Sequence, residues 1–305
     1  MTQPCLPPLG NFSPLSFEMP RGACDSHAHV FGPFDSFPLA DDRSYTPQEY
    51  PAPAFVAHLD RFNLDRGVLV TGSANGTDNR TLLGALNAYP DQLRGVVVPS
   101  NTTTPAELAA WHDAGVRGVR INLFKRDGQA VYRNGVGLEV LEALAPIIAG
   151  FGWHAQIWIH APDLPELAPR LLRLGLPLVI DHMGRMATSR GVNDSGFQFL
   201  CRMLSEGTAW VKLSGADRNG ATGQPYTDVS PFALALIKAN IDRVIWGSDW
   251  PHINYFKAED IPDDGALVNL LAQWLPNETQ RHRVLVDNPE KLYDFPVMRV
   301  PYGQG

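Results

Sequence analysis

Eight short apolar runs alternate with amphipathic stretches along this chain, and this alternation constrains the fold more than any other feature of the sequence. The runs are rich in Val and Ile, which is typical of parallel strands buried on both faces. We predict strands at residues 24–31, 67–71, 95–99, 116–123, 154–160, 178–182, 210–213 and 244–247. Most segments between them have the apolar spacing of surface helices. We predict helices at residues 78–89, from 104 onwards, and at 138–151, 163–174, 195–204, 230–239 and 264–275.

The eight strand–helix units predict an α/β fold of the (β/α)8 barrel type. The alternative is an open, doubly wound sheet. Such a sheet normally carries a glycine-rich phosphate loop after its first strand, and residues 27–32 do not form one. The proline-rich residues 1–21 predict an N-terminal arm. Residues 22–305 predict one barrel domain that ends in further helices within 277–292.

Composition and charge exclude several classes of protein. Hydrophobic residues make up 44% of the chain and charged residues 19%, which is typical of a globular protein with a sizeable core. The net charge of -7 argues against binding to nucleic acid or to a membrane surface. Three widely spaced cysteines form no disulfide framework, and residues 1–8 have no basic segment followed by an apolar one. We therefore expect a cytoplasmic protein; no pattern indicates its oligomeric state.

The first predicted strand ends with His27 and His29, two residues apart. Side chains alternate along a strand, so both imidazoles leave the same face. Two imidazoles directed at one point can bind a metal ion or polarise a carbonyl group. A pair of surface or core histidines without a function is the alternative interpretation.

Other polar residues follow the later strands, and in a barrel these carboxyl ends of the strands surround the active site. They are Arg120, Arg126, His160, Asp181, His182, Arg185, Arg218, Asp249 and His252. Asp249 lies in a turn preceded by glycine and flanked by tryptophan, which favours a function for it. For Arg120 and Arg126, the alternative to a functional role is the formation of ion pairs at the surface. His160 could reach the site or fill the barrel, and we expect His58 to face solvent on a helix.

Five segments together resemble the 2-pyrone-4,6-dicarboxylate lactonases of the amidohydrolase superfamily. They are residues 25–31, 76–79, 120–122, 180–185 and 247–252. The resemblance runs from about residue 22 to 293, and relatives in this branch also act on sugar lactones and muconolactones. It implies an amidohydrolase-like barrel and a hydrolase that opens an anionic lactone in aromatic degradation. The chain departs from the pattern at Trp158, where these lactonases carry a tyrosine.

The resemblance also implies roles for individual residues. His27, His29, His182 and Asp249 match the catalytic set. The substrate-binding positions are Arg120, Arg126, Arg185, Arg218, His252 and Trp158.

The chemistry of these residues agrees with the roles that the resemblance implies. A carboxylate such as Asp249 can take a proton from water, and we expect burial to raise its pKa. Imidazoles can polarise the lactone carbonyl, and several guanidiniums in an acidic protein suit a ligand with more than one negative group.

We expect no obligatory cofactor, as the resemblance implies. One divalent ion, zinc or manganese, could be held by His27, His29, His182 and Asp249, with His160 as a substitute for His182. A two-metal site is not expected, because Arg120 and Asn122 on the fourth strand are poor bridging ligands. The alternatives are a sugar-acid lactonase, a lactone isomerase and a metal-dependent decarboxylase on the same barrel. A barrel that only binds an acidic metabolite would not need this set of acid–base residues.

Overall fold

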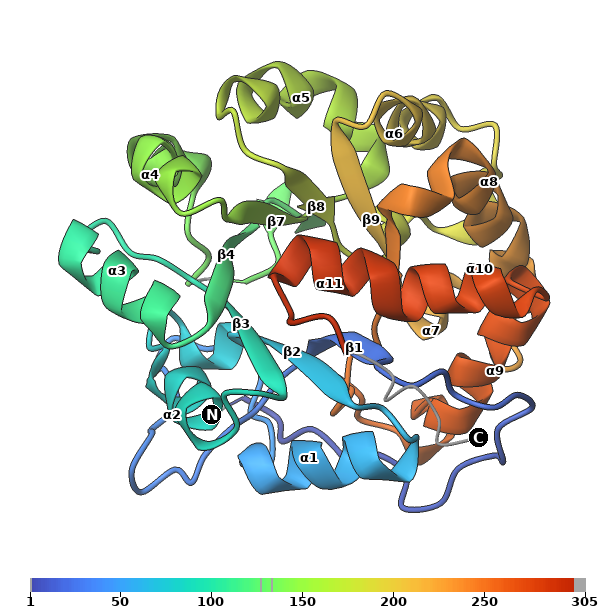
Figure 1. Ribbon diagram of the computed structural model, residues 1–305, viewed down its shortest axis with the longest axis horizontal. Helices are drawn as coiled ribbons and strands as arrows, with labels where there is room; N and C mark the ends of the chain where they lie inside the picture. Colours follow the sequence, from blue (N-terminus) through green and yellow to red (C-terminus); the bar gives the residue numbers. More distant parts are fainter. Residues whose placement is uncertain (1, 127, 133, 299–305) are drawn as a thin grey trace, which may run out of the picture.

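Eight parallel strands form a closed barrel in the computed structural model, which describes residues 2–126, 128–132 and 134–298 (Figure 1). The strands, in the order in which they pair, are β1 (Cys24–Ala28), β2 (Arg66–Val70), β3 (Leu93–Val97), β4 (Val116–Asn122), β7 (His154–Trp158), β8 (Leu178–Ile180), β9 (Ala209–Leu213) and β10 (Val244–Trp246). All eight predicted strands are confirmed, and so is the (β/α)8 class. The last strand meets the first where Asp249 N donates to His27 O at 2.9 Å and His29 N donates to Trp250 O at 2.8 Å.

Helices surround this barrel and cover the outer faces of its strands (Figure 1). They are α1 (Ala52–Arg61), α2 (Arg80–Ala88), α3 (Pro105–Asp113), α4 (Leu138–Gly150), α5 (Leu164–Arg173), α6 (Ser195–Ser205), α7 (Ala216–Asn219), α8 (Ser230–Asn240), α9 (Asp264–Trp274), α10 (Glu278–His282) and α11 (Asn288–Tyr293). The sequence analysis expected His58 on a helix but gave no bounds for α1, which has prolines at positions 51 and 53 around its start. A proline in the first turn of a helix leaves no hydrogen bond unmade, so it can begin one.

The predicted start of α3 at Thr104 shows how local sequence sets these boundaries. The Thr104 hydroxyl accepts from Glu107 N at 3.2 Å, and the Glu107 carboxylate accepts from Thr104 N at 2.8 Å. This reciprocal pair satisfies two of the amide groups that a helix start leaves without a partner. Pro105 follows as the first helical residue, with its φ already in the helical range.

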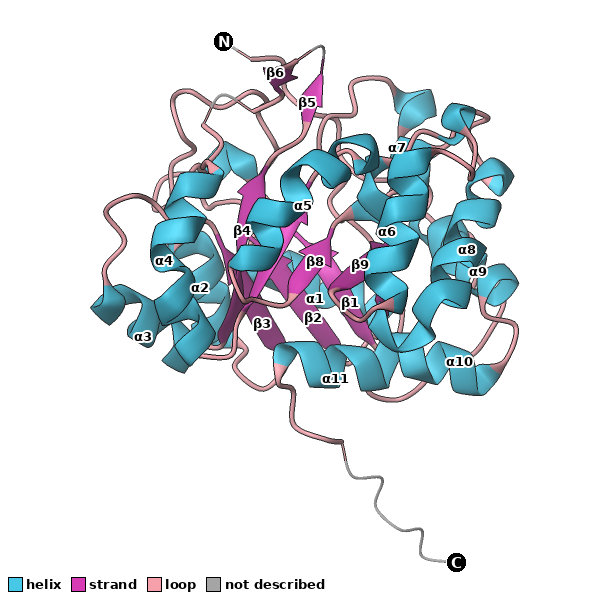
Figure 2. Ribbon diagram, turned by 90° about the horizontal axis from the view of Figure 1, so that it is seen from above, coloured by secondary structure: helices cyan, strands magenta, loops and turns pink. Residues whose placement is uncertain are grey.

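The interior of the barrel is apolar at its amino end and polar at its carboxyl end. Side chains from β1, β2, β3, β8, β9 and β10 form an apolar cluster together with Tyr293 and Phe295 of the C-terminal segment. Helix α11 lies across this end of the barrel, and the small hairpin of β5 (Lys125–Arg126) and β6 (Gln129–Ala130) lies at the other (Figures 1 and 2). The amino end is therefore closed, and only the carboxyl end remains for a ligand.

The segment before β1 contains no helix or strand among its described residues, 2–23, yet it packs along the barrel. Cys5 N donates to Thr46 O at 2.8 Å, and Ser13 donates to the Asp263 carboxylate at 2.7 Å. Among the described residues, no helix is long and apolar enough to cross a bilayer.

Candidate active site

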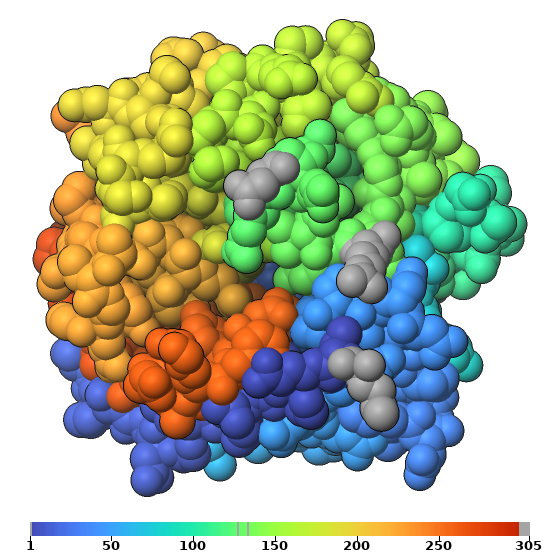
Figure 3. Space-filling view, turned by 180° about the vertical axis from the view of Figure 1, so that it is seen from behind, coloured from blue at the N-terminus to red at the C-terminus, as the bar shows by residue number. Residues whose placement is uncertain are grey.

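A cavity of about 350 Å³ opens at the carboxyl ends of the strands. Figure 3 shows this face hollowed at its centre, between the green, orange and blue parts of the chain. Its lining contains most of the residues that the sequence singled out, together with several that it did not. The lining residues are His29, Ser44, Ser73, Arg120, Phe124, Arg126, Val131, Tyr132, Trp158, His182, Arg185, Arg218, Asp249, Ile253, Asn254 and Phe256.

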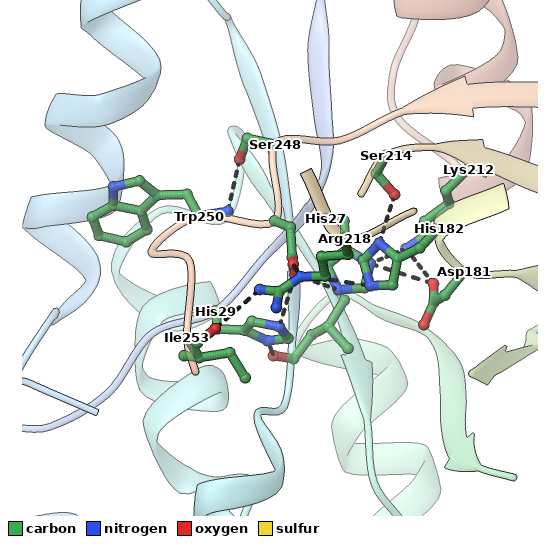
Figure 4. A network of polar contacts seen from close by, with 12 residues as sticks. His27, His29, Asp181, His182, Lys212, Ser214, Arg218, Ser248, Trp250 and Ile253 are labelled. Carbon is green, nitrogen blue, oxygen red and sulfur yellow. Dashed lines mark hydrogen bonds and ion pairs between the residues drawn. The ribbon is translucent and has the colours of Figure 1, made fainter. Parts of the chain in front are cut away.

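Asp249 lies at the floor of this cavity, with three imidazoles around one of its oxygens. Oδ1 lies 3.5 Å from His29 Nε2, 3.6 Å from His27 Nε2 and 3.9 Å from His182 Nε2. All four side chains are almost completely buried. His27 lies one layer below the other two and is not part of the cavity lining. The four residues predicted to be catalytic thus lie close together; Figure 4 labels the three histidines.

The backbone after β10 turns sharply to bring Asp249 to this place. Asp249 has a φ of 66°, a left-handed conformation that is uncommon for a residue other than glycine. The Asp25 carboxylate holds the turn, because it accepts from Ser248 N at 2.9 Å and from Ser248 Oγ at 2.5 Å. Asp25 also accepts from His27 N at 3.1 Å. One buried carboxylate therefore fixes both the base candidate and the first histidine.

Gly247 permits this close approach. A Cβ atom at position 247 would lie 2.6 Å from both Cβ and N of His27. We expect Gly247→Ala to displace β1, to lower the free energy of unfolding by about 2 kcal/mol, as overpacking of a core does, and to lower kcat. Denaturant unfolding and initial rates measure both effects. Gly150→Ala is the matched control, because nothing lies within 4 Å of its added Cβ. Equal stability of the two variants would contradict the prediction.

Hydrogen bonds to Nδ1 orient the imidazoles that line the cavity. His29 Nδ1 lies 2.8 Å from Val70 O, a carbonyl that can only accept, so His29 carries its proton on Nδ1. His182 Nδ1 lies 2.9 Å from Ser214 Oγ. Such partners fix the ring orientation and the tautomer of a functional histidine. The other ring nitrogen of His29, Nε2, is thereby held 3.5 Å from Asp249 Oδ1.

A second group of polar side chains lies beneath the histidines, and the sequence analysis missed two of its members. Lys212 and Gln156 are fully buried in β9 and β7, and Lys212 Nζ donates to Gln156 Oε1 at 2.7 Å. Asp181 accepts from Gln156 Nε2 at 3.1 Å and from Arg120 Nε at 3.2 Å. A lysine within an apolar strand is a signal that could have revealed this layer, because an unpaired buried charge is costly.

The pKa of Asp249 differs from our expectation. Burial raises it, but the Arg218 guanidinium and the neighbouring imidazoles outweigh burial and hold the pKa well below its usual range. Arg218 Nε donates to Asp249 Oδ2 at 2.6 Å. Burial thus acts in the predicted direction, but the net pKa of Asp249 is lowered because Arg218 and the imidazoles outweigh it. Asp249 is ionised at neutral pH, and its second oxygen, Oδ2, accepts the hydrogen bond from Arg218.

Burial keeps His27 and His182 neutral. It lowers the pKa of His182 to about 4 against the opposing charge of Asp249, and it lowers the pKa of His27 well below the ordinary value. Burial also lowers the pKa of Lys212 to about 8, although Asp181 opposes this shift. The floor of the cavity thus places one carboxylate beside the neutral imidazoles of His27 and His182, which suits proton transfer and hydrogen bonding.

All four predicted substrate-binding arginines line the cavity. Arg120 and Arg218 use Nε for their ion pairs with Asp181 and Asp249. Arg185 Nη1 donates to the neutral Asn219 Oδ1 at 2.7 Å, and burial lowers the Arg185 pKa to about 10. Arg126 is exposed at the rim. Positive charge is therefore concentrated in the cavity of an acidic protein, and a carboxylate or sulfonate would complement it.

An aromatic group forms one wall of the cavity. The Trp158 ring lies between Tyr132 at 4.9 Å and Phe124 at 4.8 Å, measured between ring centroids. The Arg120 guanidinium lies 5.9 Å from the Trp158 ring centroid. Trp158 therefore lines the cavity as predicted. Tyr132 was missed, because it lies after the β5–β6 hairpin and not at the end of a barrel strand.

Three histidines lie elsewhere than expected. His252 is not in the cavity lining, and its Nε2 lies 2.7 Å from Asp264 Oδ1 of α9. His160 lines a separate cavity with Asp163 and does not fill the barrel. His58 does not face solvent: it is 6% exposed, and its ring centroid lies 5.3 Å from that of Trp250. The structure thus gives His252 and His58 internal contacts behind the turn that carries Asp249.

The His252–Asp264 pair makes stability depend on pH. Burial lowers the His252 pKa, but Asp264 outweighs it and raises the pKa, so this stabilisation is complete below the histidine's ordinary pKa of about 6.5 and is lost as pH rises. We expect His252→Gln to lower the free energy of unfolding by about 3 kcal/mol at pH 6 and by less at pH 9. Denaturant unfolding at both pH values measures this difference. A loss of unfolding free energy that is the same at both pH values would contradict this prediction.

The donor atoms on the cavity floor could hold one metal ion. His27, His29 and Asp249 each bring one ligand atom, all within 4.8 Å of one another, and His27, Asp181 and His182 form a second such group. Imidazole and carboxylate ligands suit zinc or manganese. His27 Nε2 is buried and has no hydrogen-bond partner among the described residues, as expected at a ligand position. The residues thus fit one divalent ion.

Comparisons with known proteins place this site in context. A family model described as Amidohydrolase matches residues 24–295. A 4-sulfomuconolactone hydrolase of Rhizobium radiobacter is 38% identical over 95% of this chain and 96% of its own. A 2-pyrone-4,6-dicarboxylate hydrolase of Comamonas testosteroni is 38% identical over 93% of both chains. A D-galactarolactone isomerase of Agrobacterium fabrum is 29% identical over 90% of this chain and 91% of its own.

Solved structures agree with these matches. A probable 2-pyrone-4,6-dicarboxylic acid hydrolase of Acinetobacter baumannii, with citric acid bound, superposes with a TM-score of 0.77 and 29% identity. The match covers 90% of this chain and 100% of that protein. Both the arrangement of the strands and nearly the whole length of the chain are therefore shared.

Proposed function

The chain belongs to the amidohydrolase family, and we propose that it hydrolyses an anionic lactone of the 2-pyrone-4,6-dicarboxylate type. It is an enzyme that acts on a cyclic ester, as expected from its resemblance to two hydrolases at 38% identity. One observation carries the finer proposal: the acid–base group of Asp249, His29 and His182 shares a single cavity with Arg120, Arg185 and Arg218. The citric acid bound to a structural relative supports an anionic ligand.

Asp249 acts as the general base of the proposed reaction. It takes a proton from water, and the hydroxide adds to the lactone carbonyl carbon. His182 donates a hydrogen bond to the oxyanion that develops. The bond from this carbon to the ring oxygen then breaks. The ring oxygen leaves with the electron pair and takes the proton that Asp249 accepted from water, and the new carboxylic acid releases its own proton to solvent.

Arg218 links substrate binding to the strength of this base. In the ligand-free protein its charge lowers the pKa of Asp249, which makes the carboxylate a weak base. A substrate carboxylate that binds Arg218 shares this positive charge. The pKa of Asp249 then rises as burial favours the protonated form, and the base becomes stronger only when substrate is present.

A divalent ion, held by His27, His29 and Asp249, would polarise the carbonyl and lower the pKa of bound water. The arginines and the aromatic wall orient the ring whether or not such an ion is bound. The described donor set therefore supports hydrolysis with direct polarisation by imidazoles, and it could accommodate an ion in the same place.

The test is a comparison of two substrates, each with and without a chelator. We expect ring opening of 2-pyrone-4,6-dicarboxylate, followed by loss of its ultraviolet absorbance, and slower turnover of 4-sulfomuconolactone. Turnover that survives chelation supports polarisation by imidazoles, and turnover restored only by zinc or manganese assigns that step to an ion. Turnover of neither substrate, with or without added metal, would refute the proposed substrate class.

A lactone isomerase is the second candidate, favoured by the relative named D-galactarolactone isomerase at 29% identity. Isomerisation moves the acyl group between two hydroxyls without net uptake of water. Hydrolysis in oxygen-18 water places the label in the new carboxylate, and isomerisation does not. Release of carbon dioxide would instead indicate the decarboxylase alternative.

A further inference from the structure

Lys212 is a fully buried cation at the centre of the barrel, and the mechanism above gives it no role. We propose that Lys212 is a positioning residue, which fixes His27 in the tautomer that carries its proton on Nε2 and so directs that proton at Asp249. The catalytic consequence rests on the proposed hydrolysis, but the tautomer itself does not.

The Lys212 ammonium has three protons and three acceptors. Its Nζ lies 2.7 Å from Gln156 Oε1, 2.8 Å from Ser26 O and 3.2 Å from His27 Nδ1. Figure 4 shows Lys212 beside His27 and Asp181. Lysine can only donate through its ammonium group. His27 Nδ1 must therefore present a lone pair, and in a neutral imidazole the proton then lies on Nε2.

The other end of the ring favours the same tautomer. His27 Nε2 lies 3.6 Å from Asp249 Oδ1 and has no hydrogen-bond partner among the described residues. An N–H at this position faces a carboxylate, which is attractive, whereas a lone pair there would repel it. Small movements on substrate binding can shorten this contact into a hydrogen bond. His27 thus helps to hold the Asp249 carboxylate in place from the layer beneath the cavity floor.

Asp181 competes with Lys212 for a hydrogen bond with His27 Nδ1. Its Oδ1 lies 3.3 Å from Nδ1 and has no hydrogen-bond partner among the described residues. The opposite tautomer, with the proton on Nδ1, would satisfy Asp181. It would also direct that proton at the Lys212 ammonium and leave a lone pair facing Asp249. Removal of Lys212 should release His27 into this opposite tautomer.

The tautomer also controls metal binding. An ion that binds His27 Nε2 must displace this proton, which would then move to Nδ1 and face the Lys212 ammonium, so Lys212 weakens ion binding beside His29 and Asp249. Without Lys212, all three donor atoms can present lone pairs. Loss of this one cation should therefore weaken catalysis and strengthen zinc binding.

The experiment compares the full-length wild type, Lys212→Met and a matched control, Arg66→Met. Arg66 is also a buried cation, but it lies in the apolar end of the barrel and pairs with Glu290 at 2.8 Å. Nitrogen-15 histidine NMR spectra report the tautomer, and the signal missing from His27→Asn identifies His27. Zinc affinity is measured by calorimetry with zinc alone, and kcat and KM are measured with 2-pyrone-4,6-dicarboxylate.

We expect the Nε2–H tautomer in the wild type and the Nδ1–H tautomer in Lys212→Met. In that variant kcat should fall about 10- to 100-fold with KM little changed, and zinc affinity should rise at least about tenfold. Arg66→Met should lose stability but keep the tautomer. An Nδ1–H signal in the wild type would overturn the proposal even if Lys212→Met does not fold. So would a folded Lys212→Met protein with an unchanged tautomer. Absence of turnover in all proteins would refute the substrate while leaving the tautomer measurable.

Discussion

Replacement of Asp249 by Asn should lower kcat about 10³-fold while the protein stays folded, because the amide cannot take a proton from water. Asn keeps the size of Asp and can fill the same place among the three imidazoles. The arginine contacts with the substrate carboxylates remain, so KM should change little. Initial rates on 2-pyrone-4,6-dicarboxylate and thermal unfolding, measured on the same preparation, check both parts of the prediction.

Asp264→Asn is the matched control for this variant. Asp264 is also a buried carboxylate paired with an imidazole, but it lies outside the cavity and contacts His252. We expect it to lose stability and to keep most of its kcat. Full activity in Asp249→Asn would assign the base to another group, and His29 Nε2 would become the first candidate. Equal loss of kcat in both variants would indicate a structural cause.

Replacement of Arg218 by Met should lower kcat/KM about 100-fold and move its acid limb to higher pH. The loss reflects a charge-assisted hydrogen bond to the substrate, worth about 3 kcal/mol. The shift of the acid limb to higher pH has a separate cause. Arg218 holds the pKa of Asp249 below its usual range, and without it burial raises that pKa. A smaller fraction of Asp249 is then ionised at acidic pH, so activity falls earlier as the pH is lowered.

The control for Arg218 is Arg126→Met, which removes a positive charge from the exposed rim of the same cavity. Arg126 makes no described contact with Asp249, so its loss should weaken binding without moving the acid limb. A pH–rate profile of kcat/KM for the two variants separates these effects. If both profiles keep the wild-type acid limb, Arg218 does not set the basicity of Asp249.

Local patterns in the sequence were sufficient to predict the barrel. Eight Val- and Ile-rich runs predicted all eight strands, because strands buried on both faces have a nearly continuous apolar signal. His27, His29, His182 and Asp249 could be found for a similar reason. Polar residues at the carboxyl ends of parallel strands converge in a barrel, whatever the details of packing.

The tertiary structure alone decided the state of these groups. The pKa of Asp249 depends on a guanidinium 31 residues away in the chain, at a distance of 2.6 Å. No local pattern encodes such a contact. The inward direction of His58 and the pairing of His252 with Asp264 depend in the same way on how α1 and α9 pack against the turn after β10.

The sequence by itself determined which chemical groups this protein brings to one end of a barrel: the carboxylate, the imidazoles and the arginines. The tertiary structure determined their protonation, their partners and the layer beneath them. Lys212 and Gln156 belong to apolar strands and meet Ser26 and His27 only when the barrel closes. Electrostatic interactions depend on distance through space and on burial, and neither quantity can be read along a chain.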